Sequence, residues 1–215
     1  NPMLTLTKEK LMNVIDISIP LQEGMITYPN NPPFNKKQRS TKNSILSEIT
    51  MGSHTGTHYD FPSHANASNK ASDAFKLNIF FQECQVLDLT DCDAKIEVED
   101  LKKKIITKRV VLMKTKNSYR GFKTFYPDYV YLSDTAADYL ATLSLDIVGI
   151  DFISIKGAAE TNNKAHTNLL SKNILILEGI DLNSVTEGIY FFSGLPLKIT
   201  DTDGAPARVV IIDNL

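Results

Sequence analysis

The hydrophobic pattern divides the chain into many short apolar segments separated by polar turns. Two segments have helical spacing: 97–106, and 134–143, which follows Ser133, a good N-cap residue. The remaining apolar or alternating segments predict strands at 14–19, 45–51, 85–89, 110–113, 145–150, 173–177, 188–192 and 207–212. Many strands with few helices predict a mixed α/β domain with a substantial central sheet.

One long segment, from Gly24 to Phe34, has neither pattern. It contains Pro29, Pro32 and Pro33 together with other turn formers, so it predicts an extended and fairly rigid loop without regular structure. Loops of this length in a compact domain are often functional. Two basic runs are expected on the surface: 36–39 in a loop and 102–104 on the outer face of a helix.

The composition is that of an ordinary globular protein. The chain has 215 residues, 42% of them hydrophobic and 22% charged, with a net charge of −2. This near-neutral balance argues against nucleic-acid and membrane partners, and the apolar runs are too short to cross a bilayer. We expect one domain over 13–215, preceded by an N-terminal extension, 1–12, that can include part of a cloning scar.

The cysteines and the N-terminus bear on the cellular compartment. Cys84 and Cys92 form no C-x-x-C pair, which argues against a disulfide framework and a zinc ribbon. The N-terminus shows no basic start followed by an apolar stretch and a cleavage site. We therefore expect reduced thiols in a cytoplasmic protein.

Three of the four histidines of the chain fall within residues 54–64. The residues at every second position of this segment are His54, Gly56, His58, Asp60, Pro62 and His64. In an extended chain these side chains would share one side, but the Cα atoms of His54 and His58 would lie about 13 Å apart. That is too far for both to bind one ion, so the segment must curl, and Gly56 permits the curl.

The fourth histidine, His166, is followed twelve positions later by Glu178, which ends the apolar run 174–177. A carboxylate at the end of a buried strand needs a positive partner, and a metal ion would supply one. The alternative is a glutamate that emerges into solvent as the strand ends. Imidazole and carboxylate groups without a thiolate suit zinc or manganese.

The segment 54–64 reads His-Thr-Gly-Thr-His-Tyr-Asp-Phe-Pro-Ser-His. It resembles the H-x-G-T-H-x-D-x-P-x-H signature of the cyclase family of metal-dependent hydrolases, which includes bacterial kynurenine formamidases and isatin hydrolases. The similarity extends over 16–20, 24–34, 131–151, 177–179, 195–197 and 203–208. It implies a swivelling β/β/α fold with a mixed central sheet, and assembly into homodimers or homotetramers.

The resemblance also assigns roles to individual side chains. The implied metal ligands are His54, His58, Asp60, His166 and Glu178. His54, His58 and Asp60 would hold a first ion. Asp60 would also bridge to a second ion, completed by His166 and Glu178. His64 would be the catalytic acid/base residue. The expected cofactor is Zn²⁺, one or two ions per chain, with Mn²⁺ as the alternative.

The substrate is less constrained by the resemblance. Kynurenine formamidases typically carry tryptophan before the proline that corresponds to Pro29, whereas this chain has Tyr28 there and contains no tryptophan. Tyr28, Phe34 and Phe61 are the candidate aromatic contacts to a substrate.

The predicted function is hydrolysis of a small-molecule amide, N-formylkynurenine, to kynurenine and formate. A metal-activated water would attack the carbonyl and His64 would protonate the departing nitrogen. A cyclic amide such as isatin, an imide or a lactone is the alternative substrate. A non-catalytic metal-binding protein is the alternative of another class.

Overall fold

The computed structural model describes residues 12–66 and 68–213. The expected N-terminal extension therefore lies, apart from its last residue, outside the described residues. The helices are α1 (Pro62–Ala65), α2 (Val98–Lys102), α3 (Asn117–Arg120), α4 (Asp134–Ala141) and α5 (Lys164–Leu170), with short 3-10 turns at Ser72–Ala74 and Leu77–Phe80. In the described part of the chain, no helix is long and apolar enough to cross a membrane.

The strands of the structure are β1 (Asn13–Asp16), β2 (Asn35–Ser40), β3 (Ile45–Thr50), β4 (His58–Asp60), β5 (Phe81–Asp88), β6 (Lys95–Ile96), β7 (Val110–Lys114), β8 (Tyr131–Leu132), β9 (Ile147–Ile150), β10 (Leu175–Glu178), β11 (Gly188–Pro196) and β12 (Gly204–Asp213). Eight of them form one sheet in the order β1-β12-β11-β5-β7-β9-β10-β4. Strand β12 also pairs with β4, so the sheet closes on itself. The pairs β5–β7, β7–β9 and β9–β10 are parallel and the others antiparallel, which confirms a mixed α/β fold.

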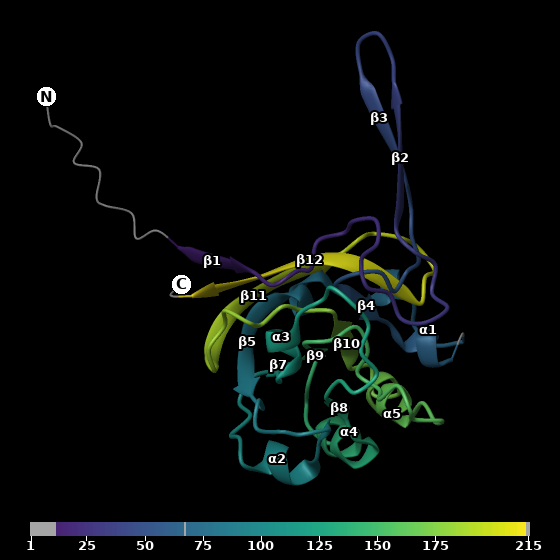
Figure 1. The fold of residues 1–215 in the computed structure, drawn as a ribbon. Coiled ribbons are helices and arrows are strands. Elements are labelled where there is room, and N and C mark those ends of the chain that lie inside the picture. Colours follow the sequence, from purple (N-terminus) through teal and green to yellow (C-terminus); the bar gives the residue numbers. More distant parts are fainter. Residues whose placement is uncertain (1–11, 67, 214–215) are drawn as a thin grey trace, which may run out of the picture.

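Side-chain alternation along the strands builds a core on each face of the closed sheet. On β7, Val110 and Leu112 point into the closed sheet, whereas Val111 and Met113 point outward. The outward residues pack against α2, α4 and α5, which lie together on one side of the sheet (Figure 1). The parallel strands are buried on both faces, and this explains their continuous apolar sequences.

Most of the predicted elements of the central sheet and α4 are confirmed. Ser133 caps α4, because its Oγ accepts a hydrogen bond from the backbone N–H of Ala136 at 3.2 Å. The helix predicted at 97–106 is shorter, since α2 ends at Lys102. Ile105 is 83% exposed and so does not contribute to an apolar helix face. Apolar spacing alone overestimated this helix.

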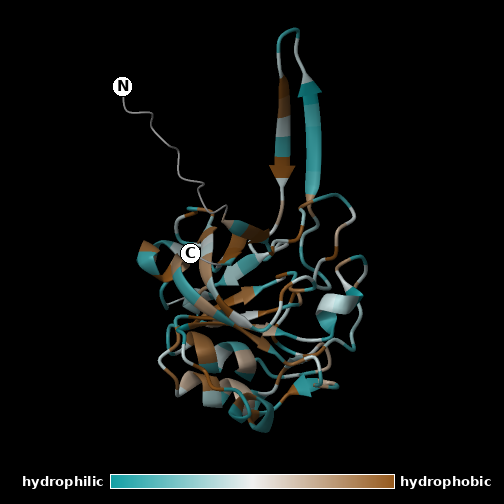
Figure 2. Cartoon of the chain, turned by 90° about the vertical axis from the view of Figure 1, so that its left-hand side faces the viewer, coloured by the Kyte–Doolittle hydropathy of each residue, from teal (hydrophilic) through white to brown (hydrophobic). Residues whose placement is uncertain are grey.

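Strands β2 and β3 form a separate hairpin that projects from the body of the protein (Figure 2). The strand predicted at 45–51 is present, but it pairs only with β2 and not with the central sheet. The basic run 36–39 was predicted in a loop, and this prediction is wrong because the run lies in β2. Every residue of both strands is exposed, so neither strand contributes to the core.

Asp151 follows β9 and fixes the turn before α3. Its buried carboxylate accepts hydrogen bonds from the backbone N–H and Oγ1 of Thr115 at 2.7 and 2.8 Å, and from those of Ser118 at 3.0 and 2.6 Å. Burial raises the pKa of Asp151 despite these donors. The residue therefore has a structural role at this turn.

The substitution Asp151→Ala should therefore destabilise the fold, because it removes the buried carboxylate that accepts hydrogen bonds from Thr115 and Ser118. We expect a loss of about 2–4 kcal/mol in the free energy of unfolding, measured by urea denaturation. Asp138→Ala, at an exposed position on α4, is the matched control. A change below about 0.5 kcal/mol in both variants would contradict the assigned role.

Candidate metal centre

Strand β4 places His58 and Asp60 on the outer face of the closed sheet. It lies between β10 and β12, with His58 opposite Glu178 in the antiparallel register of β10. Alternation turns Tyr59 and Phe61 the other way, into the core. The strand thus presents imidazole and carboxylate groups beside Glu178, in agreement with the period-two pattern of the sequence.

The predicted curl is present at Gly56, whose φ is +69°. Gly179, with φ +70°, lies against it: a Cβ atom there would be 2.5 Å from the carbonyl oxygen of Gly56. Only glycine adopts such a conformation readily and permits so close an approach. The curl returns His54 to the strand, where its Nδ1 lies 2.7 Å from Oδ1 of Asp60.

Helix α5, which the apolar spacing did not predict, brings His166 to the same place. Its Nε2 lies 3.4 Å from Oδ2 of Asp60 and 3.3 Å from Oε1 of Glu178. Glu178 is only 3% exposed, so the alternative of a solvent-facing glutamate is wrong. Its Oε1 also accepts the backbone N–H of Ile155 at 2.6 Å. Residues more than a hundred positions apart thus converge.

The separations within this group fit a divalent ion better than a hydrogen-bond network. Nε2 of His58 lies 3.5 Å from Asp60 Oδ1 and 3.4 Å from Glu178 Oε2, and the His166 distances are similar. Two ligands that each lie about 2.1 Å from a tetrahedral zinc ion are themselves about 3.4 Å apart. Moreover, Asp60 Oδ2 is buried and finds no hydrogen-bond partner in the described part of the chain.

The orientation of the His58 ring also supports the binding of a divalent ion. Its Nδ1 lies 2.9 Å from the carbonyl oxygen of Gly56, to which a protonated Nδ1 donates. This contact leaves Nε2 to face the two carboxylates. A backbone acceptor on the far nitrogen is the usual arrangement that orients a metal-binding histidine. His58, Asp60, His166 and Glu178 could therefore hold one ion.

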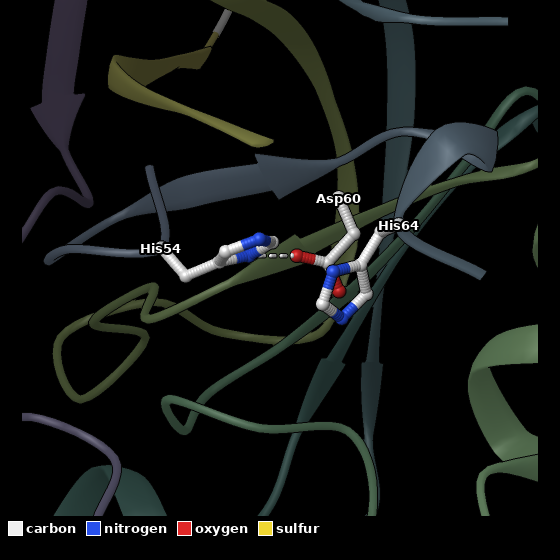
Figure 3. A group of neighbouring side chains, drawn as sticks. All are labelled: His54, Asp60 and His64. Carbon is white, nitrogen blue, oxygen red and sulfur yellow. Dashed lines mark hydrogen bonds and ion pairs between the residues drawn. The ribbon is translucent and has the colours of Figure 1, made fainter. Parts of the chain in front are cut away.

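A second group lies beside the first. Ligand atoms of His54, Asp60 and His64 all lie within 4.8 Å of one another, so they could also hold an ion (Figure 3). The rings of His54 and His64 approach to 4.3 Å between centroids. His64 belongs to α1, where Pro62 occupies the first turn and Phe61 is the extended N-cap residue. Asp60 lies in both groups, as a bridging ligand would.

Asp203 belongs to the site and was not among the predicted residues. Its Oδ2 lies 2.9 Å from Nε2 of His54 and 3.3 Å from Nδ1 of His64. Burial raises the pKa of Asp203, but hydrogen bonds from His54 and other neighbours outweigh it and hold this pKa well below its usual value. The signal in the sequence was the place of Asp203 in segment 203–208, which resembles the family. In the structure Gly204 leaves room for the His54 ring, because a Cβ there would lie 2.6 Å from it.

A pocket of about 200 Å³ opens over these groups. Its lining residues are Tyr28, Asn31, His54, Asp60, His64, Ile153, Ser154, Lys156, Asn163, His166 and Glu178. Tyr28, from the proline-rich loop, is half-buried and contacts Phe125 edge-on, with 5.9 Å between ring centroids. Phe34 and Phe61, the other proposed aromatic contacts, are 6% and 0% exposed and do not line it. Strand alternation directs Phe61 into the core instead.

The histidines of the centre bind protons strongly when no ion is present. Burial lowers the pKa of His58, but the carboxylates of Asp60 and Glu178 beside its ring outweigh this effect and raise the pKa to about 10. Burial also lowers the pKa of His166, but the same two carboxylates outweigh this effect and raise the pKa to about 9. Both rings are therefore protonated at neutral pH in the ion-free protein.

Metal uptake should consequently release protons, because a histidine ligand must be neutral. With two rings deprotonated on binding, the apparent affinity for Zn²⁺ should rise about 100-fold per pH unit below pH 9. Competition titrations against a chelator of known affinity, from pH 6.5 to 8.5, measure this slope. A pH-independent affinity, after correction for the chelator, would show that these rings are not ligands.

Known proteins are similar to this chain over most of its length. The family model described as "Putative cyclase" matches residues 15–156. Kynurenine formamidase of Bacillus cereus is 30% identical over 206 residues, covering 92% of this chain and 96% of the relative. A solved structure titled as a predicted metal-dependent hydrolase, from Bacillus stearothermophilus, is 35% identical with a TM-score of 0.86, covering 95% of this chain and all of the other.

A more distant structure shares the fold. Isatin hydrolase A from Ralstonia solanacearum is 20% identical with a TM-score of 0.78, and the match covers 94% of this chain and 92% of that protein. At this identity the similarity extends to the fold alone.

Proposed function

The chain belongs to the cyclase family and is a hydrolase of amide C–N bonds, and we propose that it hydrolyses N-formylkynurenine to kynurenine and formate. The observation that carries the proposal is the convergence of two histidines and two carboxylates at ligand separations beneath an open pocket. We propose Zn²⁺ as the ion, one or two per chain, with Mn²⁺ as the alternative.

Each part of the site has a task in this reaction. When bound, the ion supplies a water of lowered pKa and polarises the carbonyl. Tyr28 stacks on the aromatic ring of the substrate from the proline-rich loop. His64, at the pocket wall, delivers a proton to the departing nitrogen. Asp203 holds the ring of His64 through its Nδ1, which leaves Nε2 free for that transfer.

The test is a comparison of substrates with metal-reconstituted protein. Hydrolysis of N-formylkynurenine, isatin and simple lactones is followed by absorbance, with metal content measured on the same samples. We expect the largest kcat/KM on N-formylkynurenine. A preference for isatin would identify a cyclic amide as the substrate and leave the proposed metal-dependent hydrolysis unchanged. No turnover of any of them by fully loaded protein would favour a non-catalytic metal-binding protein.

We also propose that the chain forms a homodimer or homotetramer in which the hairpin is covered. A two-stranded hairpin is marginally stable alone in water. Yet Ile45 and Ile49, which share one of its faces, are 71% and 55% exposed. A second copy of the chain would bury them. We further propose a cytoplasmic location, on the ground that both cysteines are free thiols.

Replacing both isoleucines by serine should therefore weaken the assembly. Burial of each isoleucine contributes about 1.5–3 kcal/mol, so the double variant should raise the dissociation constant at least about 100-fold. Size-exclusion chromatography with light scattering at several concentrations measures this. Ile105→Ser, at another exposed position, is the control. An unchanged mass for the hairpin variant at every concentration would exclude this interface.

A further inference from the structure

We propose that Lys156 is a specificity residue of the pocket: it binds an anionic group of the substrate, so the substrate class is an amide that carries a carboxylate away from the scissile bond. The inference rests on the proposed function, because it assigns the charge of the substrate in that same site.

The charge of the pocket supports this role. Lys156 is the lysine among the residues that line it, and its side chain is half-buried. Within residues 12–66 and 68–213, no carboxylate lies within 4.0 Å of its ammonium group, whereas several other lysines have such partners. The carboxylates of the metal centre, Asp60 and Glu178, face histidines and not Lys156. Among the described residues, Lys156 thus brings to the pocket wall a side chain whose charge no carboxylate neutralises.

The neutral polar side chains of the pocket fit the same kind of ligand. Asn31, Ser154 and Asn163 line the pocket together with Lys156, and amide and hydroxyl groups donate hydrogen bonds to a carboxylate. Tyr28 and Ile153 supply the apolar contacts. The pocket therefore combines an apolar wall, one cation and several neutral donors, as an aromatic amide with a carboxylate requires.

The backbone around Lys156 is held firmly, so its position is defined relative to the metal centre. Ile155, its neighbour, donates its backbone N–H to Glu178 at 2.6 Å. The carbonyl oxygen of Lys156 accepts a hydrogen bond from the hydroxyl of Tyr129. The following residue, Gly157, lies under the Tyr131 ring, where a Cβ would be 2.8 Å away. These contacts fix the point of the backbone from which the Lys156 side chain extends.

The experiment compares N-formylkynurenine with its methyl ester, in which a methyl group removes the negative charge of the carboxyl group. Zn²⁺-loaded wild type, Lys156→Met, Lys156→Arg and the control Lys172→Met, at an exposed position, are assayed on both compounds. We expect Lys156→Met to lower kcat/KM for the acid about 10- to 100-fold, mainly through KM, with little effect on the ester. Arginine should restore most of the preference.

Two outcomes would overturn the proposal. Equal losses on acid and ester would indicate a role in transition-state stabilisation or in structure. No loss on either would show that the ammonium group does not contact the substrate.

A binding measurement separates this inference from the proposed function. Titration calorimetry of kynurenine and of kynurenine methyl ester on the same Zn²⁺-loaded proteins requires no turnover. If N-formylkynurenine is not hydrolysed, yet wild type prefers the acid and Lys156→Met does not, the assignment of Lys156 stands and the proposed reaction fails. If wild type hydrolyses N-formylkynurenine but binds the acid and the ester equally, the reaction stands and the assignment of Lys156 fails. If wild type neither hydrolyses N-formylkynurenine nor prefers the acid, both the proposed reaction and the assignment of Lys156 fail.

Discussion

Asp60→Asn should abolish both metal binding and hydrolysis while leaving the fold intact. Asp60 is 1% exposed, and three histidines surround its carboxylate. Burial raises the pKa of Asp60, but the neighbouring rings of His166, His54 and His58 outweigh this effect and keep the pKa well below its usual value. The carboxylate is therefore a fixed negative charge at the centre of the site, and asparagine replaces it with a neutral amide of the same size.

The expected effect is large because one partner of a buried charged group is removed. A loss of roughly 3–5 kcal/mol corresponds to about a 150- to 5000-fold weakening of Zn²⁺ binding. Metal content after dialysis and competition titration measure it, and circular dichroism checks the fold. Asp73→Asn, at an exposed position, is the control. Full metal occupancy in a folded Asp60→Asn protein would mean that the ion binds elsewhere.

The sequence was most informative where one local rule determines the structure. Alternation in segment 54–64 predicted that His58 and Asp60 share a face. The distance between His54 and His58 in an extended chain predicted a curl, which Gly56 permits and which brings His54 back to the strand. The apolar runs of β7, β9 and β10 likewise predicted buried strands, because sheets covered on both faces require them. These inferences needed only neighbouring residues.

Features that depend on distant contacts could not be predicted from spacing. Helix α5 has only seven residues and a helix of that length is held by tertiary packing, so its own sequence gave little signal. Asp203 acts through His54 and His64, which lie far away in the chain. Phe61 was proposed as a substrate contact from its residue type, whereas strand alternation places it in the core.

His64→Ala should separate metal binding from turnover. As the acid/base residue, His64 contributes about 100- to 10,000-fold to kcat, and its loss should leave the group of His58, Asp60, His166 and Glu178 loaded. Metal content and kcat are measured on the same preparation. If Zn²⁺ is lost together with activity, His64 is a ligand, a role that its proximity to His54 and Asp60 also permits.

Asp203→Asn sharpens this comparison because it alters the support of His64 without removing the ring. Its carboxylate lies within 3.3 Å of both His54 and His64. We expect about a 10-fold loss of kcat with metal retained, since loss of a group that orients such a residue costs about 10- to 100-fold. A smaller loss than in His64→Ala, together with a shifted pH profile of kcat, identifies Asp203 as a positioning residue. If Asp203→Asn leaves both kcat and its pH profile unchanged, His64 does not depend on the contact with Asp203.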